Sequence, residues 1–243
     1  NQNKEQERCY AGEISQRLGW EYPYKKVAAI PAKVSVTELK RWFEGELTEE
    51  TDRLPQSPGA LIKKPLFLQD KKGLSRAEAG TVMHFVMQHL DFHRTDIEVQ
   101  VREMVEKGLL TSKQAEVIEV EQIRYFLNSP LGKRILAAEP VYREVPFFME
   151  VPCSELFPEL TEELCGEEKV LLQGMIDCYF EEPEGIVLVD YKTDFVPKGR
   201  EEKIRERYRD QISYYGRALE MLTGKKVKGK YIYLFWSGEV LEY

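Results

Sequence analysis

Cysteine and histidine are scarce in this chain, which has four cysteines and three histidines among 243 residues. The cysteines are scattered, and no CxxC or CxxH pair occurs that would predict a zinc or iron–sulfur site. We therefore expect free thiols, as in a cytoplasmic protein, at Cys9, Cys153, Cys165 and Cys178.

Long apolar stretches are also missing, since no uninterrupted run approaches the roughly 20 residues of a membrane-spanning helix. The opening segment lacks the basic start and apolar centre of a secretory signal. Because the chain begins with Asn1 instead of Met, we expect it to be a piece of a longer polypeptide. A GxxxxGKS/T phosphate loop is absent, because Gly224 has no upstream glycine at the required distance. We expect any ATP-driven motor to lie outside this chain.

The formal net charge of −7 argues against a surface coated with nucleic acid, because phosphate binding depends on Lys and Arg. Basic residues are nevertheless concentrated locally. Residues 198–209 carry six basic side chains against three acidic ones, and KKVKGK follows at residues 225–230. Such runs fit either a solvated helix face or a contact with a nucleic-acid backbone, and the charge pattern leaves both open.

The sequence divides into a helical front, residues 1–139, and a strand-rich back, residues 140–243, within one expected domain. Three capping boxes predict helix starts, because a Ser or Thr and a Glu three residues later satisfy free backbone N–H groups. They pair Ser35 with Glu38, Ser75 with Glu78, and Thr95 with Glu98. We expect helices at residues 36–46, 76–91, 96–107, 112–128 and 201–222.

Residues after Pro140 are rich in β-branched and aromatic types. They predict strands at residues 141–151, 170–180, 185–193, 230–236 and 239–243. Residues 152–169 are acidic and contain Pro and Gly, so we expect a surface excursion there. The order of elements predicts an α/β (α+β) fold.

Two of these strands meet at a Glu-Pro-Glu-Gly turn that fixes their register. If Glu181 pairs with Ile186, Asp177 lies opposite Asp190, with Cβ atoms about 4.5–5.5 Å apart. Two ionised carboxylates at that distance repel each other unless a cation binds both or one is protonated. Lys192 follows Asp190 by two residues, so strand alternation points it to the same face.

Two carboxylates and an ammonium on one strand face suit a hard, oxygen-seeking ion such as Mg²⁺ or Mn²⁺. Such an ion polarises a phosphodiester and lowers the pKa of a bound water, while Lys192 orients that water or neutralises developing charge. An edge hairpin with a surface Asp–Lys pair is the alternative explanation, and these residues alone leave it open.

Three segments, GMIDCYF (residues 174–180), LVDYKTD (188–194) and YRDQISYYGRAL (208–219), resemble the RecB-type branch of the PD-(D/E)xK nucleases. SVTELKR from Ser35 and AGTVMHFVMQHLD from Ala79 extend the match over most of the chain. The resemblance implies a restriction-endonuclease-like mixed β-sheet flanked by helices, with a helical N-terminal portion. It also implies an Mg²⁺-dependent exonuclease that hydrolyses DNA, with Mn²⁺ as a substitute.

Carried over residue by residue, the resemblance makes Asp177, Asp190 and the backbone carbonyl of Tyr191 metal ligands. Lys192 becomes the catalytic lysine. His84 matches the family histidine that contributes to the metal site from a helix, although a histidine in an apolar segment also fits a structural role.

Gln211 and Tyr215 match the family's QxxxY signature, which contacts phosphate or supports the lysine. As an i, i+4 pair they also fit simple packing on one helix face. The chain has Ile176 at a position that holds proline outside the RecB-type branch. Glu144 lies in a segment that resembles the family's E-x-P-F strand, and the sequence assigns it no role.

The resemblance implies a nuclease domain attached to a helicase portion of the same longer chain. With a partner subunit, it would process double-strand DNA ends for recombinational repair in the bacterial cytoplasm. Two other functions stay open: a catalytically inactive DNA- or subunit-binding module of the same fold, and a stand-alone Cas4-like exonuclease. The intact Asp177, Asp190 and Lys192 favour an enzyme. Cas4-like relatives carry an iron–sulfur cluster with cysteines near the C-terminus, and none follows Cys178, so we expect no cluster.

Overall fold

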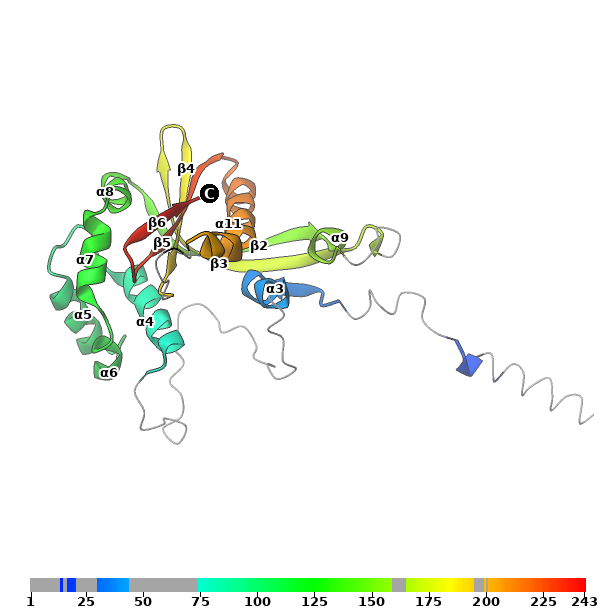
Figure 1. Ribbon diagram of the computed structural model, residues 1–243, viewed down its shortest axis with the longest axis horizontal. Coiled ribbons are helices and arrows are strands. Elements are labelled where there is room, and N and C mark those ends of the chain that lie inside the picture. Colours follow the sequence, from blue (N-terminus) through cyan, green and yellow to red (C-terminus); the bar gives the residue numbers. More distant parts are fainter. Residues whose placement is uncertain are drawn as a thin grey trace, which may run out of the picture. The chain divides into compact units, whose positions relative to one another are not determined.

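The computed structural model describes Ile14 and residues 17–20, 30–43, 74–158, 165–194, 199 and 201–243 (Figure 1). Cys9, residues 44–46 of the first expected helix, and parts of the expected excursion and basic run lie outside these ranges. The chain divides into a larger unit, residues 35–149 and 173–243, and a smaller one, residues 1–34 and 150–172. None of the described helices has the length and apolar character of a membrane span.

Two of the expected capping boxes form and start helices of the larger unit. The Ser75 hydroxyl accepts the N–H of Glu78, and the Glu78 carboxylate accepts the N–H of Ser75, at the start of α4 (Arg76–His89). Ser35 and Glu38 make the same pair of bonds at the start of α3 (Val36–Phe43). These two predictions are confirmed, and α4 ends two residues before the expected position.

The third expected capping box, at Thr95, is wrong. Asp96 is the N-cap of α5 (Ile97–Glu106), and its side chain makes no cap hydrogen bond. The Glu98 carboxylate, which would complete the expected box, accepts from Arg124 at 2.6 Å instead. The Asp96 carboxylate accepts two hydrogen bonds from Arg94, at 3.0 and 2.7 Å.

The single helix expected at residues 112–128 is also wrong, since α6 (Ser112–Ala115) and α7 (Val120–Asn128) replace it. The β-branched Val117 and Ile118 lie between them, and such residues lose side-chain freedom in a helix. Ile118 is also buried. A further helix, α8 (Pro130–Ala137), was not expected, although Ser129 caps it and Pro130 suits its first position.

The strands form a mixed sheet in the order β1-β3-β4-β5-β6, with β2 paired to β3. Their bounds are Lys33–Ser35, Val141–Pro152, Lys169–Glu182, Gly185–Lys192, Val227–Leu234 and Glu239–Glu242 for β1 to β6. β3 and β4 are antiparallel, and Glu181 pairs with Ile186 as predicted. Helix α11 (Glu201–Thr223) then returns the chain so that β5 runs parallel to β4 and Leu234 pairs with Lys192.

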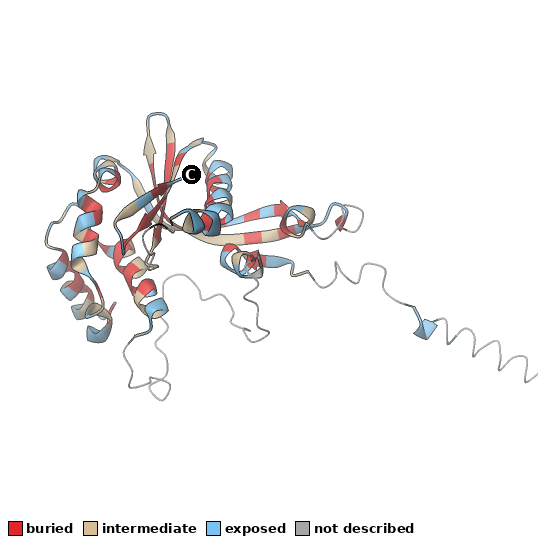
Figure 2. Ribbon diagram, in the orientation of Figure 1, coloured by how far each residue is buried: buried red, intermediate tan, exposed pale blue. Residues whose placement is uncertain are grey.

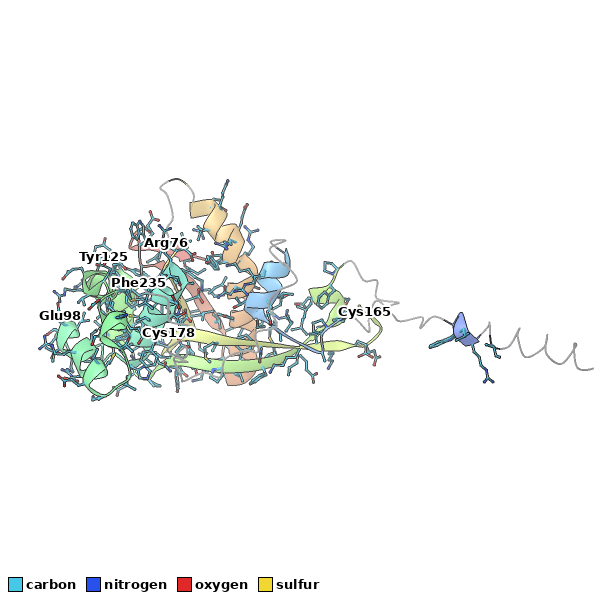
Figure 3. The ribbon with its side chains drawn as sticks, turned by 90° about the horizontal axis from the view of Figure 1, so that it is seen from below. Arg76, Glu98, Tyr125, Cys165, Cys178 and Phe235 are labelled. Atoms are coloured by element: carbon cyan, nitrogen blue, oxygen red, sulfur yellow. The ribbon has the colours of Figure 1, made fainter. Side chains whose placement is uncertain are left out.

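Helices cover both faces of the β3–β5 region, which confirms the expected mixed sheet flanked by helices (Figures 1 and 2). On one face, Cys178 and Phe235 belong to a core shared with α4, α5, α7 and α8, and Figure 3 labels both. Phe126 of α7 packs edge-on against Tyr191 there, with ring centroids 5.3 Å apart. On the opposite face, Gln211 of α11 reaches the side chain of Asp190.

Helix α4 comes close to the residue that follows the last residue of β4. A Cβ atom built on Gly80 would lie 2.7 Å from Oγ1 of Thr193, which is shorter than real Cβ contacts. The absence of a side chain at Gly80 therefore lets α4 approach the end of β4. One turn further along the same helix stands His84.

In the smaller unit, β1 pairs with β3, and the N–H of Leu171 donates to the carbonyl of Ala32. The described part of the expected surface excursion includes α9 (Cys153–Leu156). Cys153, Leu156 and Cys165 are buried, so the expectation of a purely surface segment is wrong for these residues. Sγ of Cys165 lies 3.0 Å from Sγ of Cys153, so the two ends of this segment meet.

An ion-pair cluster joins α8, β3 and β5 at Glu182. Arg134 donates to both carboxylate oxygens of Glu182 at 2.9 and 3.1 Å, and Nζ of Lys228 lies 2.7 Å from Oε2. Hydrogen bonds from Arg134 and Lys228 lower the pKa of Glu182 from 4.5 to about 2. Because this pKa is lower in the folded state, the cluster stabilises the fold above pH 4.5, and the effect is lost as the pH falls towards 2.

We expect Glu182→Gln to lower the free energy of unfolding at neutral pH by about 1 kcal/mol, a typical upper value for a partly exposed ion pair. The difference in the free energy of unfolding should shrink as the pH is lowered from 4.5 towards 2, because the ion pairs of Glu182 then contribute less to wild-type stability. Urea unfolding curves across this pH range test the prediction. The neighbouring Glu184, whose side chain is 83% exposed, provides Glu184→Gln as a control with little effect. A pH-independent difference would contradict the electrostatic explanation.

Candidate active site

The carboxyl end of β4 holds a buried ion pair. Asp190 and Lys192 lie on the same strand face, and Nζ of Lys192 is 2.5 Å from Oδ2 of Asp190. Only 1% of the Asp190 side chain is exposed. Gln211 of α11 donates from Nε2 to the other carboxylate oxygen, Oδ1, at 3.1 Å. Asp190 is thus held from its own strand and from the helix above it.

Asp177 lies where the regular pairing of β3 with β4 ends. The last pair in this ladder is Cys178 with Val189, so Asp177 comes next to the position of Asp190. Its Oδ2 accepts the backbone N–H of Tyr191 at 2.7 Å. This bond points the Asp177 carboxylate towards the end of β4 that carries the ion pair.

His84 and Glu144 complete a cluster around Asp177. Nδ1 of His84, on α4, lies 3.4 Å from Oδ1 of Asp177. One ligand atom each from His84, Glu144 and Asp177 lie within 4.8 Å of one another. Glu144 has φ 49°, a left-handed conformation that is uncommon for residues other than glycine. The unusual backbone conformation of β2 therefore occurs at Glu144, whose carboxylate joins the cluster.

Burial and crowding shift the pKa values of these groups in opposite directions. Burial, reinforced by the charge of Asp177, raises the pKa of Glu144 to about 7. Burial also raises the pKa of Asp190 to about 6, although Lys192 opposes the shift. For Asp177, burial acts upward but His84 and Lys192 outweigh it, and the pKa is lowered. For Lys192, burial acts downward but Asp190 and Asp177 keep its pKa above the ordinary value.

The donor set fits a divalent cation. His84, Glu144 and Asp177 bring one imidazole and two carboxylates together, and the charge of Asp177 also acts on the buried Asp190. Ionised carboxylates placed like this repel each other without a cation. Oxygen-rich sites of this kind with one imidazole suit Mg²⁺ or Mn²⁺. The assignment of the Tyr191 backbone carbonyl as a further metal ligand remains a prediction from the family resemblance.

Of the other predicted site residues, Gln211 reaches the centre directly and Tyr215 lies behind it. Tyr215 is 5% exposed, and its ring packs edge-on against Phe147 at 5.5 Å between centroids. Burial raises its pKa well above the ordinary value, and a hydrogen bond with Gln211 opposes this shift. Tyr215 is therefore placed to hold Gln211.

Sequence reasoning missed two contributors. Glu144 carried a signal in its resemblance to the family's E-x-P-F strand, but nothing in the sequence showed the positive φ. Tyr208 is buried, donates its hydroxyl to Oδ2 of Asp194 at 2.6 Å, and has Nζ of Lys192 4.9 Å from its ring centroid. Its place one turn before Gln211 on α11 was the available signal.

The chain also matches a known protein family over most of its length. The model of the PD-(D/E)XK nuclease superfamily matches residues 60–242, a range that contains every residue of the cluster. The chain is 59% identical over 238 residues to an ATP-dependent helicase/nuclease subunit of Acetivibrio thermocellus, and the match covers 98% of this chain and 19% of that protein. A protein of the same name from Ruminiclostridium cellulolyticum is 56% identical over 230 residues, which covers 95% of this chain and 18% of that protein.

The chain thus spans about a fifth of the length of the curated relatives it matches. The superfamily match covers most of the chain and includes both strands of the hairpin and helix α11. The chain belongs to the PD-(D/E)XK nuclease superfamily.

Proposed function

We propose that this chain is the nuclease domain of an AddA-type helicase–nuclease and that it hydrolyses phosphodiester bonds in single strands of DNA with Mg²⁺. The observation that carries the proposal is the convergence of His84, Glu144 and Asp177 beside the buried pair of Asp190 and Lys192. An inactive DNA- or subunit-binding module has no need of so many buried charges, which destabilise a fold unless they are paired.

In this mechanism His84, Glu144, Asp177 and Asp190, with the Tyr191 carbonyl, hold the cation. When bound, the cation polarises the scissile phosphodiester and lowers the pKa of the attacking water. Lys192 stays protonated because of its carboxylate neighbours. Its ammonium orients that water and stabilises the negative charge that develops on phosphorus-bound oxygens.

Gln211 and Tyr215 act as positioning residues. Gln211 donates to Oδ1 of Asp190 and Lys192 lies against Oδ2, and each oxygen keeps a further lone pair for the cation. Because Tyr215 packs behind Gln211, it limits the movement of that amide. Both residues then fix the distance between the cation site and the lysine.

The names of the relatives support a wider context. We infer that a helicase portion of the same longer chain feeds single strands to this domain, and that an AddB-type partner subunit completes the complex. The whole complex would process double-strand DNA ends for recombinational repair in the bacterial cytoplasm. The domain itself uses neither an iron–sulfur cluster nor an ATP site in this proposal. A stand-alone Cas4-like exonuclease is the alternative.

The first test is cleavage of labelled single-stranded DNA by this chain with Mg²⁺. We expect Asp190→Asn to reduce the rate by more than about a hundredfold, because it removes a cation ligand and the partner of Lys192. The folded domain without metal should be less stable than wild type, because the buried Lys192 ammonium loses its nearest carboxylate. Thermal unfolding without metal is the control. Unchanged cleavage by this variant would exclude Asp190 from the site.

Lys192→Ala should separate metal binding from hydrolysis. We expect Mn²⁺ still to raise the unfolding temperature, because the carboxylates remain and a nearby positive charge is gone. Cleavage should nevertheless be lost to a similar extent as in Asp190→Asn. If Mn²⁺ no longer raised the unfolding temperature of Lys192→Ala while cleavage was retained, Lys192 would contribute to metal binding and not to hydrolysis.

Glu144→Gln tests the residue that the sequence left unassigned. At a hundredfold excess over its dissociation constant, a ligand that binds only the folded state stabilises it by about 2.7 kcal/mol. We expect a smaller Mn²⁺-induced stabilisation in Glu144→Gln at the same concentration, because one oxygen ligand loses its charge. Glu150, an exposed residue of the same strand, gives the control Glu150→Gln. Equal stabilisation in Glu144→Gln and wild type would remove Glu144 from the cation site.

A further inference from the structure

Helices α3 and α11 pack against each other (Figure 1). A small cavity of about 120 Å³, partly open to solvent, is lined by residues of both helices. Its floor is aliphatic, since the buried Val36 and Leu39 line it. Its rim is polar and carries both signs of charge. The rim residues are Lys40, Glu206, Arg207, Asp210, Gln211 and Tyr214.

Two residues of α11 separate this cavity from the candidate active site. Gln211 lines the cavity and also donates to Asp190 at 3.1 Å. The ring of Tyr208 has Nζ of Lys40 3.9 Å from its centroid and Nζ of Lys192 4.9 Å from it. The cavity therefore lies one side chain away from the pair of Asp190 and Lys192.

We propose that this cavity receives one unstacked nucleobase of the DNA strand, next to the phosphodiester bond that is cut. The inference rests on the proposed function and adds a subsite to it. A flipped-out base packs its ring on apolar side chains and uses donors and acceptors at its edge. The aliphatic floor and the mixed rim offer both.

The charges on the rim favour a base over a phosphate. Lys40 and Arg207 would attract a phosphate, but Glu206 and Asp210 stand on the same rim and repel it. A neutral base with both donors and acceptors has no such conflict. The cavity's volume of about 120 Å³ also suits one small group instead of a stretch of backbone.

Base insertion would couple strand separation to cleavage. A base that is paired and stacked in a duplex cannot enter the cavity unless its pairing and stacking are broken. A base that has entered fixes the adjacent phosphate relative to Gln211 and Lys192. The cavity would thus select single strands over duplex DNA.

The test uses a labelled single strand in which one abasic unit is moved step by step along the chain. In wild type we expect cleavage at the bond beside the cavity to fall about tenfold when the abasic unit occupies it, in line with the loss of one base contact. Cleavage at other bonds should change little. Lys40→Ala and Asp210→Ala should lower cleavage of the intact strand and remove this position dependence. Lys203, an exposed residue of α11 outside the cavity, gives the control Lys203→Ala.

A second readout does not depend on cleavage. The fluorescent base 2-aminopurine, placed at each position of the same strand, should change its emission on binding at one position in wild type. This change should persist in Lys203→Ala and disappear in Lys40→Ala and Asp210→Ala.

The outcomes separate the two proposals. A flat abasic scan with normal metal-dependent cleavage would overturn the base subsite and leave the proposed function standing. A position dependence that survives unchanged in both Lys40→Ala and Asp210→Ala would also overturn it. Absence of metal-dependent cleavage by wild type would contradict the proposed function. The 2-aminopurine series would then decide the subsite alone.

Discussion

The site depends first on the hydrogen bond from the Tyr191 N–H to the Asp177 carboxylate. In a regular antiparallel pair, a backbone carbonyl of the neighbouring strand accepts such an N–H group. Here the carboxylate takes that place at 2.7 Å, just where the regular ladder ends. The bond gives the buried N–H of Tyr191 an acceptor, and it also fixes the orientation of the Asp177 carboxylate. His84 and Glu144 each place a ligand atom within 4.8 Å of this carboxylate.

The second constraint is the energy needed to keep charged groups out of water. Asp190 is almost fully buried, and isolated buried charges are strongly destabilising. The Lys192 ammonium and the Gln211 amide offset part of this destabilisation. The excess of carboxylates over cations, with Glu144 and Asp190 both held at raised pKa, is what a bound divalent ion would relieve. Stability and cation affinity are thereby linked in the same few residues.

Local chemistry explains what could be predicted from the sequence. The short turn before Gly185 set the β3–β4 register, and strand alternation then placed Lys192 beside Asp190. The helix starts at Ser35 and Ser75 followed from side-chain bonds within one turn. Such features depend on neighbours in the sequence, and the family resemblance extended them to His84 and Gln211.

Long-range packing explains what could not be predicted. Arg124 binds the Glu98 carboxylate of the expected capping box, and burial of Ile118 accompanies the break between α6 and α7. The role of Glu144 depends on a backbone conformation that β-type sequence patterns do not indicate. The α3–α11 cavity depends on the packing of two helices far apart in the sequence.

The contact between Gly80 and Thr193 gives the active site a mechanical dependence on a residue that performs no chemistry. Thr193 directly follows Lys192, and a methyl group at position 80 would collide with its Oγ1. Rotation of the Thr193 side chain can relieve this contact, because Oγ1 is its only atom within 3 Å and Cβ of Thr193 lies at 3.9 Å. Where neighbouring side chains block that rotation, α4 moves away from the sheet with His84, or the end of β4 moves with Lys192. The tolerance of position 80 to substitution therefore depends first on the rotation of Thr193, and then on how far the imidazole of His84 and the ammonium of Lys192 can separate.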